Sequence, residues 1–187
     1  MDKRVYVERA DPDAKGYQEG ERCWFNVINR YKWANKYVSG LTIDMPCGMG
    51  WGSSLITNAV IVGMDNCREA ISRAERLYSD IIFIEGNMLD TGFPSNFWDS
   101  IICCEGYEHV SRENQFVLMN EIHRIVKPNG IVLLTTPFVK QGEEPTKNEF
   151  HLHEPTIHEV EETIVGKFKV LEMTVPNVAR YRLKAIK

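Results

Sequence analysis

Residues 41–52 read Leu-Thr-Ile-Asp-Met-Pro-Cys-Gly-Met-Gly-Trp-Gly and hold the strongest functional signal of the 187-residue chain. An apolar, strand-like run ends in Asp44, and glycines follow at positions 48, 50 and 52. Residues 53–59 have a helix-like composition, so the stretch predicts a strand that turns into a helix through a glycine-rich loop. Because glycine has no side chain, a ligand can approach its backbone closely. The stretch predicts a site for a nucleotide-like ligand, with Asp44 available as a hydrogen-bond acceptor.

Outward from this loop, apolar runs alternate with helix-like stretches. The predicted helices lie at 68–78, 111–126 and 155–165. The predicted strands lie at 41–44, 60–65, 81–85, 98–104, 131–136, 168–175 and 179–186. The first five strands are continuously apolar, as in parallel sheets that helices cover on both faces. The last two are joined by a short turn and therefore pair antiparallel. The pattern predicts an α/β domain with a mostly parallel sheet and an antiparallel edge.

We expect residues 1–187 to form a single domain, because this length allows one sizeable core. Residues 1–20 are polar and interrupted by proline and glycine, which is typical of a flexible lead-in. A helix is expected over residues 21–38, where aromatic and apolar side chains recur with helical spacing. The core follows over residues 41–187, with a turn at residues 127–130.

The bulk composition is that of an ordinary globular protein, with 43% hydrophobic and 26% charged residues. The formal net charge is −4 and no run of Lys and Arg stands out, so we expect no nucleic-acid partner. Five cysteines without a C-x-x-C pair favour free thiols in a reducing compartment. No apolar run approaches the roughly 18–20 residues that span a membrane, and no signal peptide is recognisable. These features predict a cytoplasmic protein without a membrane span.

The ends of the next two strands carry further candidate ligand-binding residues. Asp65 ends the second strand, seventeen residues after Gly48, where a carboxylate can bind the two hydroxyls of a ribose. The alternative is that Asp65 only caps the helix that follows. After the third strand, Asn87 can contact an adenine edge, and Met88 can pack against it.

With these residues the chain resembles the class I S-adenosylmethionine-dependent methyltransferases. Their pattern is an acid, three residues and then Gly-x-Gly-x-Gly, which residues 44–52 reproduce. The nicotinamide fingerprint would instead require glycine at position 53, where this chain has Ser53. Asp65, Trp98-Asp99 and residues 127–130 also fit the family. The resemblance implies a Rossmann-like, doubly wound, seven-stranded sheet with an antiparallel C-terminal edge hairpin and helices on both faces.

The resemblance also implies S-adenosylmethionine as cofactor and a set of residues that bind it. These residues are Arg30, Asp44, Gly48, Gly50, Asp65, Asn87, Met88 and Cys104. Asp44 and the glycine backbone would hold the methionine end of the cofactor, and Arg30 would bind its carboxylate. A solvated helix arginine is the alternative for Arg30. Two departures from the family pattern are Asn87, where many relatives carry aspartate, and Met-Pro at 45 and 46.

The segment after the fourth strand carries the candidate catalytic chemistry, Glu105-Gly106-Tyr107-Glu108-His109. An imidazole can accept a proton near neutral pH, which makes His109 a candidate general base. A structural role in the turn is the alternative. The E-x-x-E-H spacing resembles that of ubiquinone-biosynthesis O-methyltransferases, where such residues can ligate a divalent cation. By that resemblance Glu105, Glu108 and His109 would hold Mg²⁺.

His151 is a second candidate catalytic residue, either as an acceptor contact or as a second base. The segments available to cover the site are short, which favours a hydroxyl of a sugar, a glycan or a small metabolite as methyl acceptor. We expect O-methylation, with N- or carboxyl-methylation of a small metabolite and a non-catalytic cofactor-binding module as alternatives. The sequence does not predict the oligomeric state.

Overall fold

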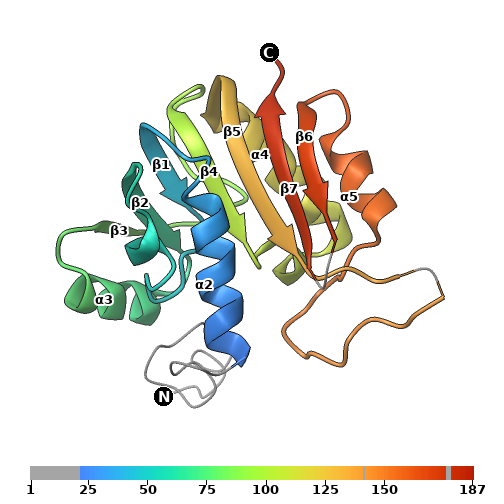
Figure 1. The fold of residues 1–187 in the computed structure, drawn as a ribbon, viewed down its shortest axis with the longest axis horizontal. Coiled ribbons are helices and arrows are strands. Elements are labelled where there is room, and N and C mark those ends of the chain that lie inside the picture. Colours follow the sequence, from blue (N-terminus) through green and yellow to red (C-terminus); the bar gives the residue numbers. More distant parts are fainter. Residues whose placement is uncertain (1–21, 141, 176–177) are drawn as a thin grey trace.

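The computed structural model describes residues 22–140, 142–175 and 178–187. Its seven strands form one sheet in the order β3-β2-β1-β4-β5-β7-β6. The first five strands pair in parallel, and β7 pairs antiparallel with both β5 and β6. Figure 1 shows β4 and β5 running to the lower edge of the sheet, beside the long segment that follows β5. The predicted Rossmann-like fold is confirmed, including the antiparallel C-terminal hairpin.

The strands closely follow the predicted apolar runs. Their bounds are β1 Leu41–Asp44, β2 Val60–Asp65, β3 Ile82–Glu85, β4 Trp98–Cys104, β5 Val126–Thr136, β6 Phe168–Thr174 and β7 Ala179–Ala185. In β4, the successive residues Ile101 and Ile102 are both fully buried and belong to different core clusters. Since neighbouring side chains on a strand point to opposite faces, both faces of the central sheet are covered.

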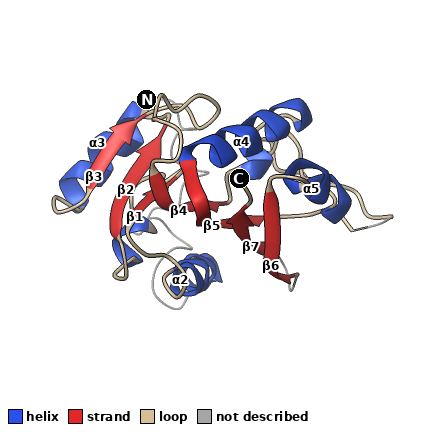
Figure 2. Ribbon diagram, turned by 90° about the horizontal axis from the view of Figure 1, so that it is seen from above, coloured by secondary structure: helices blue, strands red, loops and turns tan. Residues whose placement is uncertain are grey.

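Among the described residues, four α-helices cover the sheet unequally. Their bounds are α2 Arg22–Ala34, α3 Arg68–Leu77, α4 Arg112–Ile125 and α5 Ile157–Ile164. Figure 2 shows α3, α4 and α5 on one side of the sheet and α2 on the other. Ser111 caps α4 by accepting the Asn114 N–H. Thr156 and Glu159 form a reciprocal capping box at the start of α5.

Two predicted elements differ in the structure. Residues 53–59 hold only a short 3₁₀ turn, η1 (Ser53–Leu55), rather than a longer helix. The reason is that the Asn35 side chain accepts the N–H groups of Thr57 and Asn58, which ties this segment to the end of α2. The second difference is that residues 127–130 lie inside β5 as an irregularity, with Asn129 at a φ of 64°, instead of preceding the strand.

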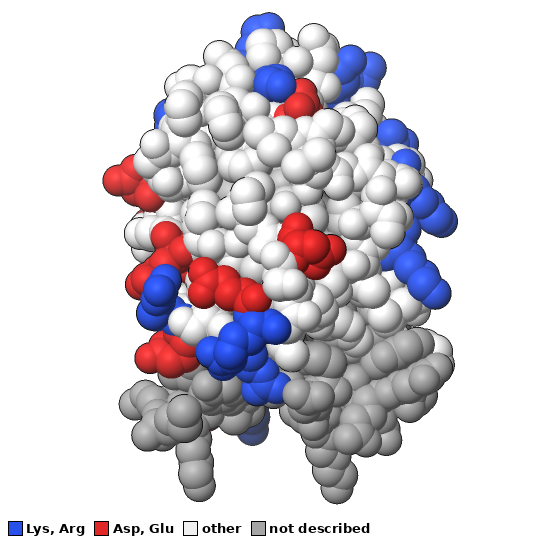
Figure 3. Space-filling view, turned by 90° about the vertical axis from the view of Figure 1, so that its left-hand side faces the viewer, with Lys and Arg blue, Asp and Glu red and all other residues white. Residues whose placement is uncertain are grey.

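The predicted lead-in at residues 1–20 lies outside the described residues. Within the described part of the chain, no helix is both long and apolar enough to cross a membrane. Figure 3 shows acidic and basic side chains scattered over one face, with uncharged surface between them. Basic side chains follow one another along the right-hand edge of that face, and acidic side chains lie mainly at the left and centre.

Candidate functional site

A cavity of about 490 Å³ lies where the parallel strands β1, β2 and β4 end. Its lining combines the glycine loop, the end of β2, the segments after β3 and β4, the segment before α5, and one side of α2. Open parallel sheets bind their ligands at this edge, where strand order reverses. The predicted residues that line the cavity are Arg30, Gly48, Asp65, Asn87, Met88, Cys104, Glu105, Glu108, His109 and His151.

Glycine is required at the three loop positions for different structural reasons. Gly48 lines the cavity and has a φ of 55°, which favours glycine. Gly50 does not line it; a Cβ there would come within 2.5 Å of the Phe83 ring, so Gly50 allows the loop to pack on the sheet. A Cβ on Gly52 would come within 2.0 Å of the Tyr31 ring on α2. The expected contact between the Gly50 backbone and the cofactor stays a prediction, since the crowded Cβ position says only that a side chain would not fit there.

Asp44 is fully buried beneath the loop and does not line the cavity. Tyr31 donates its hydroxyl to the Asp44 carboxylate at 3.0 Å, and the Ser53 hydroxyl donates to it at 2.6 Å. In this geometry the Asp44 carboxylate faces Tyr31 and Ser53, and its direct contact with a ligand stays a prediction. Asp44 joins α2 to the turn after the glycine loop and so positions residues that do reach the cavity.

Burial raises the pKa of Asp44 to about 7, because desolvation outweighs the hydrogen bonds from Ser53 and Tyr31. In the unfolded chain this carboxyl titrates near pH ~4. Between about pH 4 and 7 the folded protein therefore holds a proton that the unfolded chain has lost. The free energy of unfolding should fall as pH rises through this window, by up to about 4 kcal/mol, and stay low above it.

Asp44→Asn is expected to remove this pH dependence. The asparagine carries no charge at any pH, so the variant should exceed the wild type in free energy of unfolding at pH 8 and differ little at pH 4.5. Urea unfolding of the cofactor-free proteins at both pH values measures this difference. Asp80→Asn, which changes an exposed acid, is the matched control and should leave the pH dependence intact. Parallel pH curves for Asp44→Asn and the wild type would contradict the prediction.

Asp65 is buried at the end of β2 and faces the cavity. One carboxylate oxygen accepts the Gly48 N–H at 2.9 Å, and the other accepts the Cys67 N–H at 3.0 Å. Asp65 thus fixes the glycine loop and the start of α3 at once, and ribose binding by Asp65 stays a prediction.

Asn87 and Met88 follow β3 on the same edge. The Asn87 side-chain oxygen accepts the Leu89 N–H at 3.0 Å, which shapes a tight turn and leaves its NH₂ group as the donor for a ligand. Both residues line the cavity. Their positions agree with the predicted adenine-binding end.

Arg30 and Glu105 meet inside the cavity wall. An Arg30 guanidinium nitrogen lies 3.3 Å from a Glu105 oxygen, and the Thr135 hydroxyl donates to the other oxygen at 2.7 Å. Glu105 has a φ of 53°, a strained backbone conformation for a non-glycine residue that often marks functional sites. The solvated-arginine alternative for Arg30 is wrong, because its side chain is mostly buried and paired.

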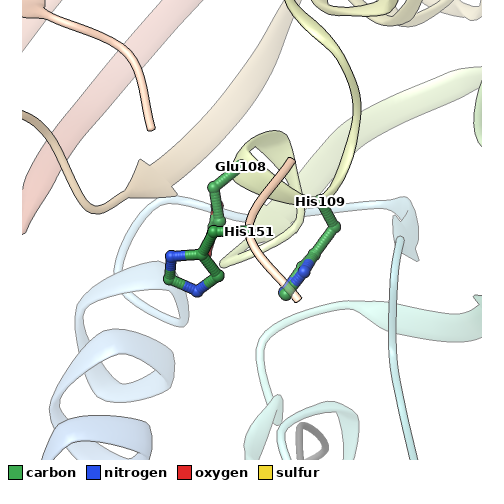
Figure 4. A group of neighbouring side chains, drawn as sticks. All are labelled: Glu108, His109 and His151. Atoms are coloured by element: carbon green, nitrogen blue, oxygen red, sulfur yellow. The ribbon is translucent and has the colours of Figure 1, made fainter. Parts of the chain in front are cut away.

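Glu108, His109 and His151 form a cluster beside this pair. One possible ligand atom from each side chain lies within 4.8 Å of those of the other two. Figure 4 shows Glu108 and His109, from the segment after β4, next to His151, from the segment after β5. The predicted metal set of Glu105, Glu108 and His109 is not the set that the fold gathers. Glu105 is engaged by Arg30 and Thr135, and His151 stands in its place.

Outer contacts orient each member of this cluster. His109 Nδ1 lies 3.1 Å from the Phe150 carbonyl oxygen, and His151 Nδ1 contacts the Glu154 carboxylate. Thr136 donates its hydroxyl to Glu108 at 3.0 Å. Burial, together with the nearby Glu105 charge, holds the pKa of Glu108 well above its ordinary value.

The sequence profile of the family described as "Methyltransferase domain" matches residues 43–134, which include the glycine loop, Asp65 and β4. A "Probable S-adenosylmethionine-dependent methyltransferase" of Mycolicibacterium smegmatis is 24% identical over 151 residues. That match covers 77% of this chain and 58% of the relative. Together with the fold, these matches support a class I S-adenosylmethionine-dependent methyltransferase.

Other methyltransferase relatives align over shorter stretches. A sterol 24-C-methyltransferase of Pneumocystis carinii is 34% identical over 100 residues, which cover 48% of this chain and 26% of the relative. A further relative is named phosphoethanolamine N-methyltransferase. The chain therefore spans 58% or less of the length of these curated relatives. Among solved structures, the PH0226 protein from Pyrococcus horikoshii superposes with a TM-score of 0.78 at 19% identity, covering 98% of this chain and 97% of the other, which shows a shared fold.

Some residues of this methyltransferase site carry little signal in the sequence. Tyr31 and Ser53 hold Asp44, yet each is an ordinary core or turn residue when viewed alone. The helical spacing of Tyr31 and Val27 from the end of α2 predicts only a buried face. Glu154 follows His151 by three residues, which could have suggested an acid–imidazole pair. Phe150 acts through its backbone carbonyl, for which no side-chain pattern exists.

Proposed function

We propose that this methyltransferase binds S-adenosylmethionine in the cavity and transfers its methyl group to a hydroxyl of a small molecule or glycan. The cofactor supplies a methyl group on a sulfonium, so the protein has to align the acceptor and manage its proton. Two features support the proposal: the cofactor-type residues around the glycine loop, and an imidazole beside them whose basic nitrogen is defined.

Each part of the cofactor would meet suitable residues in the cavity. Asp65 would accept the ribose hydroxyls, and Asn87 with Met88 would contact the adenine. Arg30 would bind the methionine carboxylate in exchange for part of its pairing with Glu105. Cys104, buried at the end of β4, would line the floor. A volume of about 490 Å³ is in the range of small-molecule sites.

The observation that carries hydroxyl methylation is the contact between His109 Nδ1 and the Phe150 carbonyl oxygen. A carbonyl oxygen can only accept, so Nδ1 must carry the proton and donate it. In the neutral imidazole the lone pair then belongs to Nε2, which can accept a proton from an acceptor hydroxyl. N- and carboxyl-methylation need no such base, which makes them the weaker alternatives.

The acceptor side is formed by a segment without regular secondary structure. Residues 142–156, between β5 and α5, contain no helix or strand and bring Phe150 and His151 to the cavity. Within the described residues, this segment forms no cap subdomain over the acceptor. This arrangement suits one sugar of a larger, flexible glycan as well as a small metabolite. The named relatives methylate different acceptors, so they do not favour one of these.

An acceptor panel tests the proposal. The protein is incubated with S-adenosylmethionine labelled on the methyl carbon and with sugars, glycans, phenols, amines and carboxylic acids. We expect a labelled methyl ether on a hydroxyl, with one equivalent of S-adenosylhomocysteine per product. A labelled amine or methyl ester would support the N- or carboxyl-methyltransferase alternative. Cofactor binding without S-adenosylhomocysteine from any acceptor would support a non-catalytic binding module.

A further inference from the structure

The cluster of Glu108, His109 and His151 has the composition of a metal site. Two imidazoles and one carboxylate come from two segments, and their possible ligand atoms lie within 4.8 Å of one another. Ligands of one cation lie about 3–4 Å apart, because metal–nitrogen and metal–oxygen bonds measure about 2.1 Å. Small side-chain rotations would therefore bring the three atoms onto one ion.

The surroundings of the cluster resemble the outer contacts of metal-binding histidines. Such histidines donate the ring N–H that is not bound to metal to a carbonyl or carboxylate, which fixes ring orientation and tautomer. His109 Nδ1 contacts the Phe150 carbonyl oxygen, and His151 Nδ1 contacts Glu154. Glu154 is itself held by Thr146, whose backbone N–H donates to it at 2.9 Å. For His109, the carbonyl contact assigns the ring lone pair to Nε2.

The ligand types select the metal. Mg²⁺ is bound mostly by carboxylates, phosphates and water, whereas imidazole suits zinc, iron, nickel and copper. The one acid that would make the set oxygen-rich, Glu105, is engaged by Arg30 and Thr135. This leaves two nitrogens and one oxygen from the protein.

We infer that Glu108, His109 and His151 form a binding site for a divalent transition-metal ion, with its remaining coordination positions directed into the cavity. All three residues line the cavity wall. Metal binding at this site does not depend on the proposed function. A role of the metal in the reaction rests on the proposed function. A bound metal would take the Nε2 lone pair of His109; it would lower the pKa of an acceptor hydroxyl bound to it, and the proton would pass to solvent water.

Titration with Co²⁺ tests the site, because the visible spectrum of Co²⁺ reports the number and kind of its ligands. The EDTA-treated and dialysed protein is expected to bind one equivalent with nitrogen and oxygen ligands. Equal concentrations of Mg²⁺ should not displace it. His151→Ala and Glu108→Gln should each weaken binding by about 100-fold or more, since loss of an outer partner alone costs about 10–100-fold. Glu154→Gln, which changes such a partner, should weaken binding by about tenfold.

Two matched variants serve as controls. Glu105→Gln changes the neighbouring acid outside the inferred set, and His158→Ala removes an exposed histidine on α5. Both should bind Co²⁺ like the wild type. The inference fails if the wild type shows no saturable binding, if His151→Ala binds equally well, or if thiolate bands show a cysteine ligand. S-adenosylmethionine affinity and methyl transfer are measured on the same samples. Methyl ether formation without metal binding refutes only the metal site, and metal binding without transfer refutes only the proposed function.

Discussion

His109→Asn is expected to lower kcat by about 10²–10⁴-fold with a hydroxyl acceptor. The asparagine NH₂ group can still donate to the Phe150 carbonyl oxygen, so the turn should keep its shape while the Nε2 nitrogen is lost. The loss is expected whether Nε2 accepts the proton itself or binds a metal. Steady-state kinetics with the acceptor identified by the panel measures the effect, and KM for S-adenosylmethionine should change little.

The comparison variant for this position is His109→Gln, which places an amide near the lost Nε2. An amide is not a base at neutral pH, so this variant should be as slow as His109→Asn. Added imidazole should restore part of the activity of His109→Asn if His109 acts as a base. A kcat within a few-fold of the wild type for both variants would refute proton removal by His109 and favour an acceptor that needs no base.

Asp65→Ala is expected to weaken S-adenosylmethionine binding by about 100-fold or more. Hydrogen bonds to a charged group contribute about 1.5–3 kcal/mol each, and two ribose hydroxyls would lose their acceptor. The Gly48 N–H would lose its partner as well, which loosens the loop. Isothermal titration calorimetry measures the dissociation constant.

Glu85→Gln is the matched control for Asp65. Glu85 pairs with Asp65 in register at the end of the neighbouring strand β3, but it is half-exposed and does not line the cavity. Its replacement should leave the dissociation constant nearly unchanged. Equal losses in the two variants would indicate a general effect of charge at this edge rather than ribose binding.

The sequence predicts this fold well because the fold depends on local patterns. Continuous apolar runs mark the central strands, and the short interval between the last two predicted strands implies an antiparallel pair. The errors arise where a distant side chain decides the local structure. Asn35 ends the turn after Ser53, and this could not be read from residues 53–59 alone.

The site was predicted by family pattern more than by geometry. Asp65, Asn87 and His109 reach the cavity because they follow strand ends, which the sequence locates. Asp44 does not reach it, since only the packed α2 brings Tyr31 over its carboxylate. The cluster contains His151 where the sequence predicted Glu105. His151 reaches the cluster because the segment after β5 folds back toward the end of β4, and no local sequence spacing predicts that path.

The contact between Gly52 and Tyr31 constrains how relatives of this chain can diverge. A methyl group at position 52 needs room that only a smaller residue at position 31 would give. With that smaller residue, Asp44 would lose the hydrogen bond that the Tyr31 hydroxyl donates to it. The two positions should therefore change together in evolution, and a single exchange at either should be rarer among homologues than the matching double exchange. Position 31 lies on α2, before the segment that the family model matches at 43–134. The residues allowed in the glycine loop therefore depend on a helix outside that segment.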